Sequence, residues 1–158
     1  MLDCPSLRSA LELASALHAS GVSAAPRPRR VLIADDDDEM RSMLVGELGR
    51  DGYDVVPARN GAEVATLLAD GQERRGAALD IIVMDICMPA RGGLELLSDL
   101  RSLGLRVPVI LMTAFGGPSI HETARQLGAI AVFDKPFDLD DLRTAILNYL
   151  PAAPDRDG

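Results

Sequence analysis

The sequence predicts an α/β fold in which helices cover both faces of a doubly wound, five-stranded parallel sheet. From Val31 onwards, short apolar runs alternate with segments of helical periodicity, and the alternation occurs five times by residue 150. Such a pattern calls for parallel strands joined by right-handed crossovers. The apolar runs are continuous rather than interrupted by polar residues at every second position, as expected for strands that are buried on both sides.

Five apolar runs are the predicted strands. The runs VLIA, DIIVM and PVILM are the most apolar, so we expect them at the centre of the sheet. The second run contains Pro57, which cannot donate a hydrogen bond to a neighbouring strand, so that strand is predicted near an edge. The expected strands cover 31–34, 53–58, 79–85, 107–114 and 129–135.

The segments between and after the strands have helical spacing. In the first of them, Met40, Leu44 and Leu48 recur at intervals of four residues. Asp38 and Asp138 are the predicted N-caps of the first and last helices, because a carboxylate there accepts from free backbone N–H groups. The expected helices cover 38–52, 61–71, 93–104, 119–128 and 138–150.

The remaining segments flank this domain. We predict a short N-terminal helix, an Ala/Pro/Arg-rich linker and a disordered tail, which divides the chain into 1–30, 31–150 and 151–158. The N-terminal helix (6–20) could dock on the domain, bind a partner, pair two chains or have no fixed position. The arginines at 27, 29 and 30 could contact an acidic partner.

Composition limits the possible functions. The chain carries a net charge of −8, which argues against binding to a nucleic-acid backbone, and it has no Trp. No apolar run reaches the length of a membrane span. Charged residues interrupt the N-terminal segment, so we expect no signal peptide. Cys4 and Cys87 are the two cysteines, and a reduced cytoplasmic chain is the expectation.

Chemistry collects at the ends of the predicted strands. The first strand leads into Asp35 and Asp36, the third ends at Asp85, the fourth at Thr113 and the fifth at Lys135. Since ligands bind at the carboxyl ends of parallel strands, these side chains are predicted to converge. Clustered carboxylates suit a hard divalent cation, and Mg²⁺ combines with carboxylates, waters and a phosphoryl group. Lys135 and Thr113 would then contact phosphoryl oxygens.

The chain from Val31 to Leu150 resembles the receiver domain of bacterial two-component response regulators. The matching segments are VLIADDDDEMR, DIIVMDICMPARGGLELL, VPVILMTA and FDKPF, and they occur in the family's order. The match covers about three quarters of the chain. It implies a flavodoxin-like receiver fold with strand order 2-1-3-4-5, and we expect a stand-alone receiver without an output domain.

The resemblance implies a phosphorylation-dependent signalling switch. Asp85 would accept a phosphoryl group from a phosphohistidine on a sensor kinase or a phosphotransfer protein. Mg²⁺ would be held by Asp35, Asp36, Asp85 and the backbone carbonyl of Cys87. The chain would catalyse its own phosphorylation and dephosphorylation without being an enzyme in the usual sense.

The resemblance also implies how the signal would leave the site. Lys135 would pair with the phosphoryl group and Thr113 would hydrogen-bond it after transfer. The fourth helix, fifth strand and fifth helix of the domain would then change shape and bind a downstream protein or a second copy of the chain. Direct contact with nucleic acid or a membrane is not expected. The bond before Pro136 is commonly cis in this family.

The sequence departs from the family pattern in two places. Three residues before Lys135, where many receivers carry a switch aromatic, this chain has Val132. Adjacent residues of a strand face opposite ways, so Phe133 cannot simply replace that aromatic. Gly92 stands where an acidic or small polar residue is common, which would make that loop more mobile.

Two residues bear on how long a phosphoryl group would last. Cys87 and Phe115 occupy positions that border the phosphoryl group in the family, and both are poor at positioning an attacking water. We therefore hypothesise a long-lived aspartyl phosphate.

Two other functions fit parts of the pattern. Asp35 and Asp37 have the spacing of the two aspartates in phosphatases of the haloacid-dehalogenase type, although Glu39 stands where those enzymes usually have Thr or Val. The other alternative is a receiver-like adaptor that is never phosphorylated.

Overall fold

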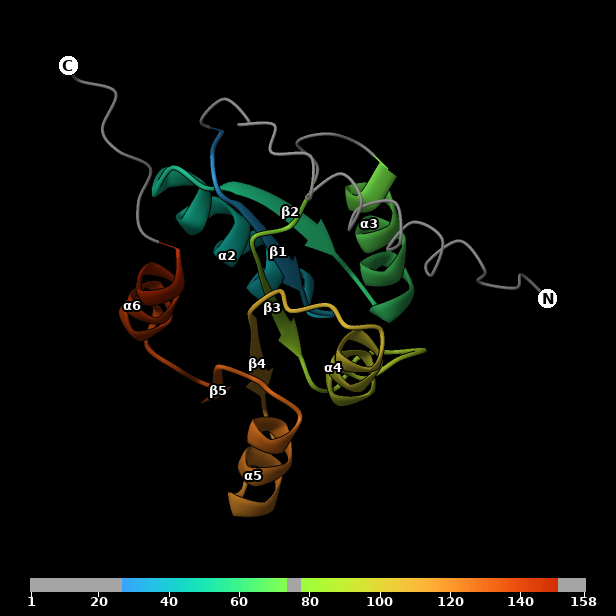
Figure 1. Ribbon diagram of the computed structural model, residues 1–158. Helices are drawn as coiled ribbons and strands as arrows, with labels where there is room; N and C mark the ends of the chain where they lie inside the picture. The colour runs from blue at the N-terminus through green and yellow to red at the C-terminus, as the bar shows by residue number, and fades with distance from the viewer. Residues whose placement is uncertain (1–26, 74–77, 151–158) are drawn as a thin grey trace.

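The computed structural model describes residues 27–73 and 78–150. Within these ranges five strands alternate with five helices (Figure 1). The strands are β1 (Arg30–Ala34), β2 (Asp54–Ala58), β3 (Ile81–Asp85), β4 (Val109–Thr113) and β5 (Ala131–Asp134). The helices are α2 (Asp38–Arg50), α3 (Gly61–Glu73), α4 (Gly93–Ser102), α5 (Pro118–Gln126) and α6 (Leu139–Tyr149). The predicted N-terminal helix and C-terminal tail lie outside the described residues.

The five strands form one parallel sheet in the order β2-β1-β3-β4-β5, which confirms the predicted topology. The register aligns the carboxyl ends of the central strands, because Ala34 of β1 pairs with Met84 of β3. The residues that follow this pair are Asp35 and Asp85. The sequence order of the strands thus places two distant carboxylates side by side.

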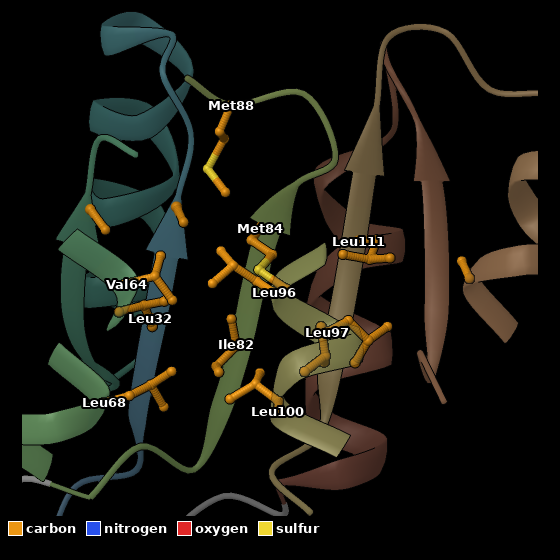
Figure 2. Close-up of a cluster of buried hydrophobic side chains, with 14 residues drawn as sticks. Leu32, Val64, Leu68, Ile82, Met84, Met88, Leu96, Leu97, Leu100 and Leu111 are labelled. Atoms are coloured by element: carbon orange, nitrogen blue, oxygen red, sulfur yellow. The ribbon is translucent and has the colours of Figure 1, made fainter. Parts of the chain in front are cut away.

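Alternate residues of the central strands enter two separate apolar cores. Leu32, Ile82 and Leu111 face one core, which they share with α3, α4 and α5 (Figure 2). Their neighbours Ile33 and Ile110 face the other core, which is covered by α2 and α6. This two-residue alternation explains why the strands are apolar throughout, since each face has its own helical layer.

Several element ends differ from the prediction by one or two residues. β1 begins at Arg30 instead of residue 31, and β4 begins only at Val109, after a proline that lacks a backbone N–H. The first helix ends at Arg50 because Gly52 turns back in a left-handed conformation (φ 96°), with its N–H donating to the Gly49 carbonyl. The second helix, α3, ends at Glu73, two residues later than predicted.

The predicted N-cap of the first helix is wrong by one residue. Asp37 is the cap: its backbone is extended, and its side chain accepts from the N–H groups of Glu39 and Met40. Asp38 is already the first helical residue and forms an ion pair with Arg41. The prediction for the last helix is confirmed, since the Asp138 side chain caps α6.

We therefore expect D37A to lower the free energy of unfolding by about 1 kcal/mol, the usual cost of losing an N-cap. D38A should cost less than about 0.5 kcal/mol, because its side chain is 82% exposed and loses only a surface ion pair. D37N should retain most of the stability, since asparagine also caps helices. Urea unfolding in the presence of EDTA checks all three, and a larger loss in D38A than in D37A would contradict the assignment.

The arginines just before and at the start of β1 have partners within the chain. Asp80 lies just before β3, and its carboxylate accepts from the Arg30 N–H at 2.7 Å. Both terminal nitrogens of Arg27 also donate to it, at 3.1 and 3.3 Å. Arg30 Nε lies 3.3 Å from Asp54. These bonds fix the entry of the chain into β1 at the amino end of the sheet.

None of the helices in the described ranges combines the length and the apolar character that a membrane crossing requires.

Candidate functional site

Three of the predicted side chains meet at the carboxyl end of the sheet. The Nζ atom of Lys135, which follows β5, lies 2.7 Å from Asp35 Oδ2 and 2.8 Å from Asp85 Oδ2. Asp35 is fully buried and Asp85 is 5% exposed. One ammonium therefore bonds to two buried carboxylates that are separated by 50 residues in the sequence.

The remaining oxygens of these carboxylates are held by backbone N–H groups. Asp35 Oδ1 accepts from Asp37 N at 2.9 Å, and Asp85 Oδ1 accepts from Cys87 N at 2.9 Å. Each acid thus bonds to the amide two residues after it. These contacts orient the carboxylates, because both oxygens of each have a fixed donor.

The pKa values reflect burial and charge together. Burial raises the pKa of Asp85 above its ordinary value, although the bonds from Lys135 and from the Cys87 amide act in the opposite direction. Burial by itself lowers the pKa of Lys135, but the hydrogen bonds and charges of Asp35 and Asp85 outweigh it and leave this pKa raised. The lysine therefore remains a cation at neutral pH.

The donor set fits a hard divalent cation. Asp35, Asp36 and Asp85 each offer a carboxylate oxygen, and these oxygens lie within 4.8 Å of one another. Asp36 is exposed, so the group opens to solvent. Three carboxylates against one ammonium leave this rim of the sheet negative, and Mg²⁺ binds through a few carboxylates while it retains several waters.

The other predicted residues lie beside this group. Thr113 ends β4 and is buried, and its hydroxyl accepts from Phe115 N at 3.1 Å. The backbone of Lys135 is paired with Thr113 through a 2.7 Å bond from its N–H to the threonine carbonyl. Phe115 is 82% exposed. Cys87 is exposed.

The side chains of Val132 and Phe133 face opposite sides of the sheet, as the sequence predicts. Val132 packs against the core on the α3, α4 and α5 side. Phe133 packs against the opposite core, where its ring centroid is 5.5 Å from that of Phe137. The adjacent phenylalanine therefore cannot take the place of an aromatic at position 132. The Lys135–Pro136 bond is cis.

The loop that follows Asp85 packs tightly under α4. The Gly93 N–H donates to the Ile86 carbonyl at 2.9 Å, and Gly92 is the N-cap of α4. A Cβ atom on Gly93 would lie 2.6 Å from the Asp85 carbonyl oxygen and 3.1 Å from Ile86 Cα. Both atoms belong to the backbone, so neither can move without displacing the loop.

We expect G93A to lower the free energy of unfolding by about 1–3 kcal/mol, as forced overpacking does. G46A is the matched control: this glycine is inside α2, and a Cβ atom there would meet nothing within 4 Å. G46A should raise the stability by about 0.5–1 kcal/mol, because alanine favours the helix. Urea unfolding of both variants tests this, and a G93A variant as stable as the wild type would contradict the packing argument.

A parallel sheet with two carboxylates, a hydroxyl and a lysine at its carboxyl end is the arrangement that the sequence predicts for a receiver domain. Comparison with known proteins agrees. The family model of the response regulator receiver domain matches residues 31–147, so the chain belongs to the response regulator receiver domain family. This is a family of phosphorylation-dependent signalling switches in two-component systems.

Individual relatives show the extent of the similarity. The chain is 32% identical over 122 residues to the sporulation initiation phosphotransferase F of Bacillus subtilis, covering 77% of this chain and 94% of the relative. It is 38% identical over 121 residues to the regulatory protein AtoC of Escherichia coli, but spans only 25% of that protein. The structure of the chemotaxis protein CheY4 of Vibrio cholerae matches with a TM-score of 0.66 and 28% identity, over 78% of this chain and all of that one.

The family assignment and the geometry both argue against the phosphatase alternative. The Asp37 carboxylate accepts from two N–H groups of its own helix and is not among the clustered acids. The pair that meets in space is Asp35 and Asp85, not Asp35 and Asp37.

Proposed function

We propose that Asp85 is the phosphoacceptor of this receiver, with a phosphohistidine on a sensor kinase or phosphotransfer protein as the donor. One observation carries the proposal: Lys135 Nζ bonds to both Asp35 and Asp85 at the rim of the sheet, with Asp36 close by. A nucleophilic carboxylate, a fixed cation and an acidic pair are the parts that phosphoryl transfer requires.

The transfer is an exchange of one bond for another at phosphorus. A carboxylate oxygen of Asp85 forms a P–O bond while the P–N bond to the donor imidazole breaks. The electron pair of that bond returns to the imidazole nitrogen, and the product is an acyl phosphate. The ammonium of Lys135 lies next to the attacking carboxylate and stabilises negative charge on the phosphoryl oxygens.

Asp35, Asp36, Asp85 and the carbonyl of Cys87 are the proposed ligands of Mg²⁺. The ion, when bound, supplies positive charge that offsets the negative charge of the transferred group. Asp35 contributes orientation, because its two oxygens are held by Lys135 and by the Asp37 N–H. Asp36 is exposed, so an ion can reach its carboxylate from solvent.

Thr113 and the elements that follow it are the proposed route of the signal. Its hydroxyl accepts from the Phe115 N–H in this structure, and a hydroxyl that accepts one bond can still donate its O–H to a phosphoryl oxygen. Further along the chain, His121 of α5 bonds to Asp134 of β5 at 2.9 Å. We propose that α5, β5 and α6 present the changed surface to a downstream protein or a second copy, within the cytoplasm.

Incubation with Mg²⁺ and acetyl phosphate, followed by mapping of any acid-labile mass increment, tests the proposal. We expect the label on Asp85, and none when EDTA replaces Mg²⁺. A label on Asp35 would instead indicate phosphatase-like chemistry. If no label forms and partner binding is unchanged, the chain is an adaptor that works without phosphorylation.

A further inference from the structure

Four consecutive aspartates, Asp35 to Asp38, follow the buried strand β1. Neighbouring negative charges repel, so a chain that folds this way needs positive groups close by. Lys135 meets the carboxylate of Asp35. A second cation, Arg41 of α2, bonds to the same loop, and its role is not part of the function proposed above.

Arg41 bonds to both ends of the aspartate run. Its Nη1 donates to the backbone carbonyl of Asp35 at 2.8 Å, and its Nη2 pairs with the carboxylate of Asp38. The Arg41 side chain is only 13% exposed. The planar fork of one guanidinium therefore holds the first and fourth aspartates in a fixed relation.

The contact to the Asp35 carbonyl matters because the same residue offers a carboxylate to the rim. Its Oδ1 is already held by the Asp37 N–H and its Oδ2 by Lys135. Because Arg41 donates to the main-chain carbonyl of Asp35, the backbone that carries this carboxylate is fixed as well. Such support of a ligand by the residues behind it sets how well the ligand binds a metal.

We propose that Arg41 is a positioning residue for the divalent-cation site. The inference rests on the proposed function, in which Asp35 and Asp36 hold Mg²⁺. This role and a purely electrostatic effect of Arg41 predict opposite changes in cation affinity when the arginine is replaced. Removing a positive charge next to an acidic site should strengthen cation binding if charge alone matters. Loss of positioning should weaken it.

The test is Mg²⁺ affinity of the unphosphorylated protein, measured from the amide NMR shifts of residues 36 and 37 at constant ionic strength. We expect R41Q to bind Mg²⁺ about tenfold more weakly than the wild type, within the range seen when supporting residues of metal ligands are replaced. R41K keeps the charge but lacks the fork, so its affinity should also fall.

R50Q is the matched control. Arg50 is on the same helix and makes the same type of ion pair three residues back, to Glu47 at 2.8 Å, but its side chain is 77% exposed. Its Mg²⁺ affinity should stay within about twofold of the wild type, because distant exposed charges are screened.

The outcomes separate the two proposals. If the wild type does not bind Mg²⁺, the proposed function and the role of Arg41 both fail. If the wild type binds and R41Q binds equally or more tightly, only the role of Arg41 fails. Should R41Q not fold, as judged by circular dichroism, R41K decides: wild-type affinity overturns the inference and reduced affinity supports it.

Discussion

Replacing Asp85 by asparagine is expected to abolish phosphorylation by acetyl phosphate or by a phosphohistidine donor. The amide has almost the same shape, and its oxygen can still accept from the Cys87 N–H that now bonds to Asp85 Oδ1. It lacks the charged nucleophile that forms the new bond to phosphorus. Intact-protein mass spectrometry in Mg²⁺ should show the added phosphoryl mass in the wild type and none in D85N.

D99N is the control for this experiment. Asp99 is an acid on α4 that pairs with Arg91, in the loop after β3, at 2.9 Å. Its side chain is 45% exposed, and it is not among the clustered acids Asp35, Asp36 and Asp85. D99N should be labelled like the wild type. A persistent acid-labile label in D85N would disprove the assignment of the phosphoacceptor.

The second large effect is expected for K135M, which removes the ammonium between Asp35 and Asp85. Phosphorylation by acetyl phosphate should slow by about 10²–10³-fold, the usual cost of losing one fixed donor to a developing charge. The variant also leaves two buried carboxylates without their cation. Stability without Mg²⁺ should therefore fall by about 2–4 kcal/mol, since breaking a buried ion pair is costly.

Urea unfolding in EDTA and in Mg²⁺ separates the two consequences. Added Mg²⁺ should restore part of the stability of K135M, because it binds the same carboxylates, but not the rate. K135R keeps a positive charge and should retain more of the stability than K135M does, although a planar group cannot reproduce the lysine geometry. A K135M variant that is as stable as the wild type in EDTA would show that the bridging bonds contribute little to folding.

Much of the acidic group at the carboxyl end of the sheet could be predicted, because the sequence itself indicates where each strand ends. A continuous apolar run that stops at a charged residue gives both the strand and the residue at its end, and parallel pairing then brings such ends together. This argument is sufficient for Asp35, Asp85 and Lys135, whose distances confirm that they meet. The roles assigned to them, to Thr113 and to the Cys87 carbonyl remain predictions.

Details that depend on individual side-chain geometry were not predictable in this way. Asp37 and Asp38 are chemically identical, and only the extended backbone of Asp37 makes it the cap. The contact from Arg41 to the Asp35 carbonyl depends on which way one long side chain turns from its helix. Its spacing from Asp38 permits an ion pair, but nothing in the spacing indicates the second bond.

The lifetime of a phosphoryl group on Asp85 also stays a prediction. The N–H groups of Cys87 and Phe115 bond to Asp85 and Thr113, and both side chains are exposed. Neither side chain offers a carboxylate or an amide that could orient a water.

The bonds between Arg27 and Asp80 determine where a label or support can be attached. Asp80 lies just before β3 and accepts hydrogen bonds from Arg27 and from the Arg30 N–H at the start of β1. It is therefore at the opposite end of the strands from Lys135. A fluorophore or a surface linker joined just ahead of Arg27 would thus leave the acidic rim accessible to a large donor protein. Binding of a kinase could be followed by surface-based kinetics in that orientation without blocking the acceptor.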